Sequence, residues 1–190
     1  MQIRTAQSYA EKISEWLSPY CSKMEIVGSI RRKVECVGDV DILVIPRIET
    51  DIDMFGEVVL VTNKLSEFLH KYIDRENPGN TSMKRPCIVS EGPTQILMHL
   101  PKCQLDIFLA NETNWVTRLL ARTGSKEHNQ WLASRALDMG WHWEPQNGLR
   151  NPQQQLHPVT SETDIYAALG VKFIAPSNRN QTWLDTHFGL

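Results

Sequence analysis

The chain has 190 residues, which allows one domain or two small ones at about 100–200 residues per domain. Apolar residues make up 41% and charged residues 22%, ordinary globular values that exclude a disordered tail, a collagen and a disulfide-rich miniprotein. Twenty Lys and Arg against 22 Asp and Glu give a net charge of −2. Any binding of nucleic acid must therefore come from local basic patches or bound metal, not from overall charge.

The sequence also bears on the compartment. It has no apolar run near the roughly 18 residues that a membrane span requires, and its start, MQIRTAQSYAEK, lacks the apolar core of a signal peptide. The four cysteines form no CxxC pair, so we interpret them as free thiols in a reducing compartment. We expect a cytoplasmic protein with no membrane partner.

Hydrophobic periodicity predicts strands and helices along the first part of the chain. The predicted helices are 5–18 and 63–73. The predicted strands are 24–27, 40–45, 86–90, 95–100 and 104–109. Two intervening segments are predicted to be loops, an acidic one at 47–57 and a turn-rich one at 76–86.

Helical patterns dominate the remainder of the chain, at 112–122 and 125–139. A short strand is predicted at Trp141–Trp143, and the edge of another at Leu149. The segment Ser161–Asp164 resembles a capping box that opens a helix to about Leu169. We therefore expect an α+β protein with a mixed α/β unit followed by a smaller α+β unit.

Carboxylates in two apolar strands form the first candidate site. Asp39 and Asp41 flank Val40, and side chains two apart on a strand share one face. Asp106 lies in a second apolar strand, QLDIFLA, and joins them if the two strands pair. Oxygen ligands of this kind suit Mg²⁺, and three carboxylates can hold two divalent ions about 3.5–4 Å apart.

A phosphate-binding turn is predicted just before this pair. Gly28 permits a tight turn, and free amides of the Gly28-Ser29 segment can bind an anion. Arg31, Arg32 and Lys33 follow at once and add charge suited to a triphosphate. A DxD pair taken alone is more often a strand cap or an exposed polar pair. The combination with a turn and cations favours a nucleotide site.

These residues also carry a family resemblance. The stretch GSIRRKVECVGDVDILV resembles the signature of the family X DNA polymerases, the DNA polymerase beta-like nucleotidyltransferases. QLDIFLA resembles the strand with the family's third aspartate, and RTGSKEHN resembles its TGS segment. TSETDIYAALGVKFIAPSNRN resembles its C-terminal stretch. The resemblance spans about residues 5–190 in the family's order. It implies a nucleotidyltransferase palm at 1–112, a mixed sheet with flanking helices, and a small α+β thumb at 113–190.

The resemblance implies roles for these residues. Asp39 and Asp41 would bind two Mg²⁺ ions, or Mn²⁺. Asp106 would bind the catalytic ion and help to deprotonate the primer 3′-hydroxyl. The residues implied to bind the nucleotide are Gly28, Ser29, Arg32 and Gly38 at the phosphates, Thr123, Gly124 and Ser125 beneath the sugar, and Asn129 at the base edge.

Departures from the family pattern matter as well. Ala121 and Arg122 occupy the positions of an aromatic pair that often rejects ribonucleotides, and Gln104 replaces a basic residue. Ala133 stands where the beta-type enzyme has an arginine near the template strand. We therefore expect relaxed sugar and base selection. We expect no lyase domain in this chain, which resembles the minimal palm-plus-thumb members of the family.

Basic side chains suggest the path of DNA. The candidates are Lys84, Arg85, Arg118, Arg122, Lys126 and Arg135. Trp141 and Trp143 are more often core residues, although base stacking by one of them stays open.

The hypothesis is a monomeric, metal-dependent DNA polymerase of family X. It would act on gapped or primer-template DNA with nucleoside triphosphates, in gap-filling repair with a possible repair-protein partner, and come from a bacterium or its virus. The alternatives are a template-independent terminal transferase, a nucleotidyltransferase acting on RNA, protein or a small molecule, or a silent binding module.

Overall fold

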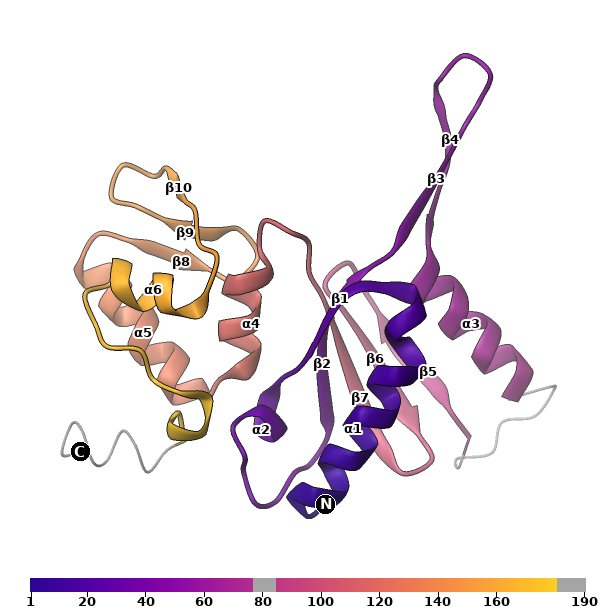
Figure 1. Ribbon diagram of the computed structural model, residues 1–190, viewed down its shortest axis with the longest axis horizontal. Helices are drawn as coiled ribbons and strands as arrows, with labels where there is room; N and C mark the ends of the chain where they lie inside the picture. Colours follow the sequence, from indigo (N-terminus) through magenta and orange to yellow (C-terminus); the bar gives the residue numbers. More distant parts are fainter. Residues whose placement is uncertain (77–84, 181–190) are drawn as a thin grey trace.

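The structure is a computed structural model that describes residues 1–76 and 85–180 (Figure 1). Its α-helices are α1 (Ile3–Leu17), α2 (Gly28–Arg31), α3 (Lys64–Glu76), α4 (Trp115–Thr123), α5 (Lys126–Asp138) and α6 (Glu162–Ala168). Two 3-10 helices are η1 (Ser18–Tyr20) and η2 (Pro176–Asn178). The strands are β1 (Cys21–Ile26), β2 (Val40–Pro46), β3 (Ile48–Ile52), β4 (Val58–Asn63), β5 (Cys87–Glu91), β6 (Gln95–Leu100), β7 (Cys103–Leu109), β8 (His142–Glu144), β9 (Gly148–Arg150) and β10 (Leu156–His157).

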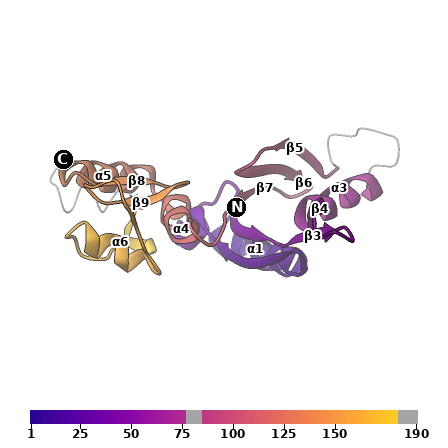
Figure 2. The same ribbon diagram turned by 90° about the horizontal axis from the view of Figure 1, so that it is seen from above.

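A five-stranded sheet in the order β1-β2-β7-β6-β5 forms the first part of the molecule. Strands β2 and β7 are parallel, and the other neighbours are antiparallel. Helices α1 and α3 lie along one face of this sheet (Figure 2). The mixed sheet with flanking helices confirms the expected α+β class, because the apolar strands and the amphipathic helix faces had to bury one another.

Alternation along β2 and β7 divides their side chains between the two faces. Val40, Ile42 and Val44 belong to the core shared with α1 and α3. Leu43 and Phe108 belong to a second core, which continues through α4 into the smaller unit. Side chains of the same parity as Leu43 and Phe108, which include Asp41 and Asp106, therefore point away from α1 and α3.

The smaller unit combines α4, α5 and α6 with a three-stranded sheet in the order β10-β9-β8. Its core includes Leu120, Leu132, Leu149 and Ile165, all fully buried. The capping box predicted at Ser161 is present, since Ser161 accepts from the backbone N–H of Asp164 and the Asp164 carboxylate accepts from that of Ser161. The two units lie end to end (Figures 1 and 2).

The prediction of an acidic loop at 47–57 is wrong. This segment begins with β3, which pairs with β4 to form an antiparallel hairpin that projects from the sheet (Figure 1). Asp53 closes its turn by accepting the backbone N–H groups of Phe55 and Glu57. Ile48, Thr50 and Ile52 are β-branched and alternate with acids, a strand pattern that the acidic composition concealed.

Three further expectations concern chain segments. Residues 77–84, most of the predicted turn-rich loop, lie outside the described residues. The boundary at residues 112 and 113 stays a prediction; α4 begins at Trp115. No described helix is both long and apolar enough to cross a membrane.

Candidate nucleotide and metal site

Three carboxylates converge on the sheet face that points away from α1 and α3. The parallel register sets Asp41 beside Asp106 on neighbouring strands. Asp39 precedes β2 by one residue and shares the parity of Asp41. Ligand oxygens of Asp39, Asp41 and Asp106 all lie within 4.8 Å of one another. The convergence expected from the sequence is therefore present.

The cluster is electrostatically unfavourable for its own carboxylates. Burial, and then the charges of Asp39 and Asp106, raise the pKa of Asp41 to about 7. Burial and the charge of Asp39 also raise the pKa of Asp106. Arg32 and Arg122 oppose the shift at Asp41. The two arginines only partly compensate the three acids, so the site favours additional positive charge.

The chemistry of this donor set fits a divalent cation. The Oδ1 atom of Asp106 is buried and has no hydrogen-bond partner among the described residues. Clustered carboxylate oxygens are the ligands that Mg²⁺ and Mn²⁺ prefer. Asp39, Asp41 and Asp106 are the residues that would hold the ions.

The glycine turn lies directly against this cluster. Gly28 begins α2 with φ +61°, and a Cβ there would lie 1.9 Å from Oδ2 of Asp41. The Ser29 Oγ atom is buried and lacks a partner within the described chain. Gly38 is exposed, with nothing near the position of a Cβ. The turn therefore brings an unused hydroxyl close to the carboxylates, as a phosphate-binding segment would.

A second turn, from Thr123 to Ser125, completes the site from the smaller unit. The guanidinium of Arg32 donates to the carbonyl oxygen of Thr123, and that of Arg31 to the Thr123 hydroxyl. Gly124 has φ +68°, and a Cβ there would lie 3.0 Å from Arg32 Nη1. Ser125 caps α5 by accepting the backbone N–H of His128. The phosphate turn and this turn are thus in direct contact.

A pocket of about 490 Å³ opens beside this turn. Its lining residues are Ala121, Gly124, Lys126, Asn129, Gln130, Ala133, Trp143 and Pro145. Asn129 Nδ2 donates to the carbonyl oxygen of Ala121 at 2.7 Å, which fixes the amide at the pocket wall. Ala121 and Ala133 leave space where larger side chains would fill it.

A buried ionic network joins the two units beside the site. Arg31 on α2 donates to Glu162 on α6 through two nitrogens, at 3.0 and 2.8 Å. Arg179, fully buried, donates to the same carboxylate at 2.8 Å. Glu162 is only 7% exposed. The network fixes the phosphate turn to the smaller unit.

The basic residues expected to contact DNA differ in exposure and in hydrogen-bond partners. Arg118 is 1% exposed and donates to Thr94 O and to the Gln146 amide oxygen, so it joins the two units and offers no charge to a DNA backbone. The burial of Arg118 argues against the expected DNA contact, which stays a prediction. Arg122 stacks on Phe108, with 4.1 Å from guanidinium to ring centre, beside the carboxylates.

The other expected DNA contacts are on or near the surface. Arg135 donates to the carbonyl oxygen of Leu169 and connects α5 to the end of α6. Lys126 and Arg85 are exposed. Lys84 lies outside the described residues. DNA contact by these side chains stays a prediction.

The sequence did not reveal Glu162 and Arg179 as members of the site. Glu162 follows the helix cap at Ser161, and its position indicates only an acidic residue in the first turn of a helix. Arg179 lies in a polar stretch without periodicity. The only signal was the acidic first turn of α6, which does not indicate a distant arginine partner.

A mixed sheet with three convergent aspartates beside a glycine turn, followed by a small α+β unit, has the palm-plus-thumb arrangement of polymerase beta. The chain has a family X DNA polymerase-like fold. Residues 118–180 match the family described as DNA polymerase beta thumb. A solved structure of polymerase beta from Leishmania infantum, a ternary P/T complex, is similar with a TM-score of 0.67. The similarity covers 95% of this chain and 76% of that chain at 18% identity. No curated protein matches the chain by sequence.

Proposed function

We propose that the chain is a metal-dependent nucleotidyltransferase that adds nucleotides to a DNA 3′-hydroxyl and fills short gaps during repair. The observation that carries the proposal is the contact between the carboxylate cluster and the Gly28–Ser29 turn. A polymerase-beta-like fold with a matching thumb supports the choice of DNA as acceptor.

Each residue has a distinct task in this reaction. The Ser29 hydroxyl and the amides of its turn bind the β and γ phosphates, and Arg32 adds charge against them. Asp106 accepts the proton of the primer 3′-hydroxyl. The resulting oxygen bonds to the α-phosphorus as the bond to the β-phosphate oxygen breaks, and pyrophosphate leaves with that electron pair.

Divalent ions held by Asp39, Asp41 and Asp106 would supply charge neutralisation at the triphosphate and the attacking oxygen. The chain itself supplies position. Gly28 brings the phosphate turn against Asp41, and Thr123 holds Arg32 between the two turns. Positioning and electrostatics are the main contributions that phosphoryl transfer requires of a protein.

The test compares nucleotide addition to single-nucleotide-gapped, blunt and single-stranded DNA, with and without Mg²⁺. We expect templated addition to the gap, and a loss of at least about a hundredfold in Asp106→Asn. Asp74→Asn, an exposed change on α3, is the matched control and keeps full activity. Addition without a template would identify a terminal transferase. No addition by the wild type, or unchanged addition by Asp106→Asn, would exclude the mechanism.

We further propose relaxed sugar selection, supported by Ala121 at the open pocket beside Asn129. The ratio of kcat/KM for a dNTP to that for the matching NTP measures it. We expect a ratio near one for the wild type and a higher ratio for Ala121→Tyr, because the ring fills the space beside the sugar. A strong deoxyribonucleotide preference in the wild type would contradict this proposal.

A further inference from the structure

The β3–β4 hairpin exposes a continuous apolar surface. Its register pairs Thr50 with Val61 and Ile52 with Val58, and directly paired residues share a face. Ile48, Ile52, Val58 and Val61 therefore form an apolar face, and all of them are exposed. Met54 and Phe55 at the tip are 88% and 83% exposed. A contiguous group of exposed apolar side chains of this kind is typical of an interaction site.

The two edges of the hairpin differ in charge. Strand β3 carries Glu49 and Asp51, whereas β4 has no charged residue from Val58 to Asn63. In the part of the chain that the structure describes, β4 has β3 as its only strand neighbour. Charged side chains protect sheet edges from pairing with another chain. The edge of β4 lacks this protection and is open to a further strand.

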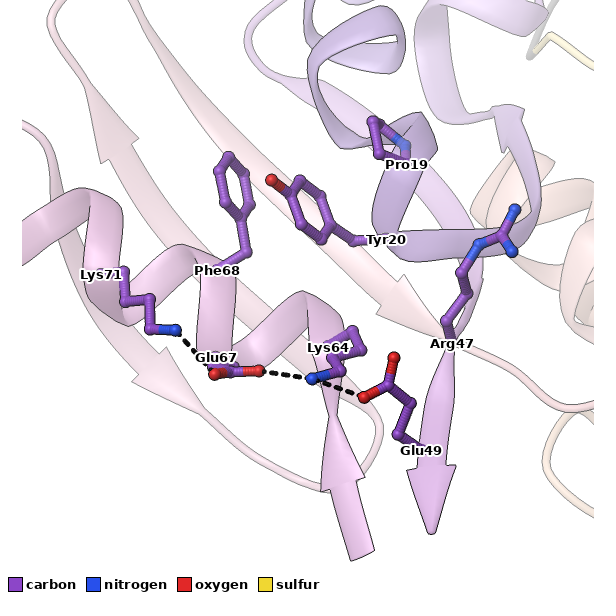
Figure 3. A pocket seen from close by; sticks show the side chains of 8 residues that line it. All are labelled: Pro19, Tyr20, Arg47, Glu49, Lys64, Glu67, Phe68 and Lys71. Carbon is purple, nitrogen blue, oxygen red and sulfur yellow. Dashed lines mark hydrogen bonds and ion pairs between the residues drawn. The ribbon is translucent and has the colours of Figure 1, made fainter. Parts of the chain in front are cut away.

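A pocket of about 380 Å³ lies at the root of the same hairpin (Figure 3). Tyr20 and Phe68 stack at its floor, with ring centres 3.9 Å apart. Its charged lining comprises Arg47, Lys64 and Lys71 together with Glu49 and Glu67. The root thus offers aromatic surface with one excess positive charge, whereas the tip offers Met54 and Phe55 flanked by acids.

We propose that two copies of this chain associate through antiparallel pairing of their β4 strands, so that the tip of each hairpin reaches the root pocket of the other. Val58 lies toward the tip and Asn63 at the root, so antiparallel pairing across a two-fold axis brings opposite ends together. The tip carries Phe55 between Asp53 and Glu57, which complements the aromatic and cationic root. The proposed dimer differs from the monomer expected from the sequence, which stays a prediction.

The charge of the hairpin favours a second copy over DNA. Residues 48–63 contain four acids and no base, so a DNA backbone would be repelled. Self-pairing at β4 places no like charges opposite each other, because that strand is neutral. The hairpin begins at Ile48, seven residues beyond Asp41, about 23 Å along an extended chain. Association at the hairpin therefore leaves the carboxylate cluster open, and it does not depend on the proposed function.

The contact area sets the expected strength. A standard-size stable interface buries about 800 Å² per partner, so the β4 pairing and the contact of tip with root would both have to contribute. We therefore expect a dissociation constant in the micromolar range, at which monomer and dimer exchange with concentration.

Sedimentation velocity from about 1 to about 200 µM tests the proposal. We expect a concentration-dependent dimer in the wild type and a dissociation constant at least about tenfold higher in Leu60→Lys, because lysine blocks an open edge. Leu137→Lys on α5 is the matched control: Leu137 is 60% exposed against 55% for Leu60, and it should leave the constant unchanged. A wild type that stays monomeric, or equal constants for the two variants, would overturn the proposal and assign the hairpin to another partner.

Two further measurements locate the contact. Hydrogen exchange should slow in residues 58–63 as the concentration rises, and Leu60→Lys should abolish this change. Phe55→Ser should weaken the dimer about tenfold while leaving the fold intact, since its side chain is 83% exposed. An unchanged constant in Phe55→Ser would disprove the contact between tip and root. Exchange in β4 that is independent of concentration would disprove the strand pairing.

Discussion

Replacing Gly28 with alanine tests how closely the phosphate turn and the carboxylate cluster are coupled. The added Cβ would lie 1.9 Å from Asp41 Oδ2, 2.7 Å from its Cγ and 2.9 Å from its Cβ. Ordinary contact begins at 3.4 Å, so the carboxylate oxygen must retreat by 3.4 − 1.9 = 1.5 Å or the turn must open. Either movement separates the two halves of the site.

The magnitude follows from two costs. A non-glycine residue at φ +61° costs about 1–2 kcal/mol in the left-handed region. Displacing a positioned group by about 1 Å costs about a hundredfold in rate. We therefore expect Gly28→Ala to lose roughly 1–2 kcal/mol of unfolding free energy and at least about a hundredfold in kcat.

Urea unfolding and gap-filling kinetics measure the two effects. Gly92→Ala is the control, because a Cβ there would meet only the carbonyl oxygen of Gln95, at 3.8 Å. Gly38→Ala adds a second comparison, since nothing lies within 4 Å of its Cβ position. If Gly28→Ala matched Gly92→Ala in both stability and kcat, the coupling between turn and cluster would be refuted.

Three other changes probe charge in the interior. Glu162→Gln should lower the unfolding free energy by about 3 kcal/mol in a urea titration, because it leaves the charges of Arg31 and Arg179 uncompensated. The control is Glu49→Gln at an exposed ion pair, which should change the unfolding free energy by less than about 0.5 kcal/mol. Burial and the charge of Arg179 lower the pKa of His128 to about 4. The unfolded chain therefore takes up the proton at a higher pH than the folded one, and the unfolding free energy falls as pH drops from about 6.5 to about 4. Denaturant melts across this range should show that His128→Phe removes this pH dependence of the unfolding free energy. The pKa of Asp41 is raised to about 7, so the folded state binds a proton that the unfolded chain has already lost, and the unfolding free energy falls as pH rises from about 4 to about 7. With chelator at pH 8, roughly a unit above that pKa, Asp41→Asn should be more stable than the wild type by on the order of 2 kcal/mol. Equal denaturant melts for the two proteins would contradict the raised pKa of Asp41.

The carboxylate cluster was largely predictable from the sequence. A period of two places Asp39 and Asp41 on one face of an apolar strand, and Asp106 lies in an equally apolar one. Their adjacency required the parallel pairing of β2 with β7, and the register that sets Asp41 beside Asp106 depends on packing across the whole sheet. Local pattern predicted the residues, but only the tertiary structure established the distance.

One wrong prediction and one unexpected placement have a common physical origin. Arg118 was expected to contact DNA, but α4 is buried between the two units and its arginine donates to Thr94 and Gln146. The hairpin at residues 48–63 was expected as a loop, because its acids suggested solvent. In both cases polarity was taken as a sign of irregular or exposed structure. A long polar side chain can make its hydrogen bonds in the protein interior, and a strand can be exposed to solvent on both faces.

Arg31 and Arg32 are neighbours in the chain, yet both guanidinium groups reach across to the smaller unit, at Glu162 and at Thr123. A hinge motion that swung the thumb away from the palm would have to strip Arg31 from a carboxylate that is 7% exposed, at a cost of several kcal/mol. The two walls of the site therefore stand at a set separation before any ligand arrives. If the proposed function is right, the nucleotide enters a preformed site. Its selection then depends on how well it fits between the two units, and not on closure of one unit over it.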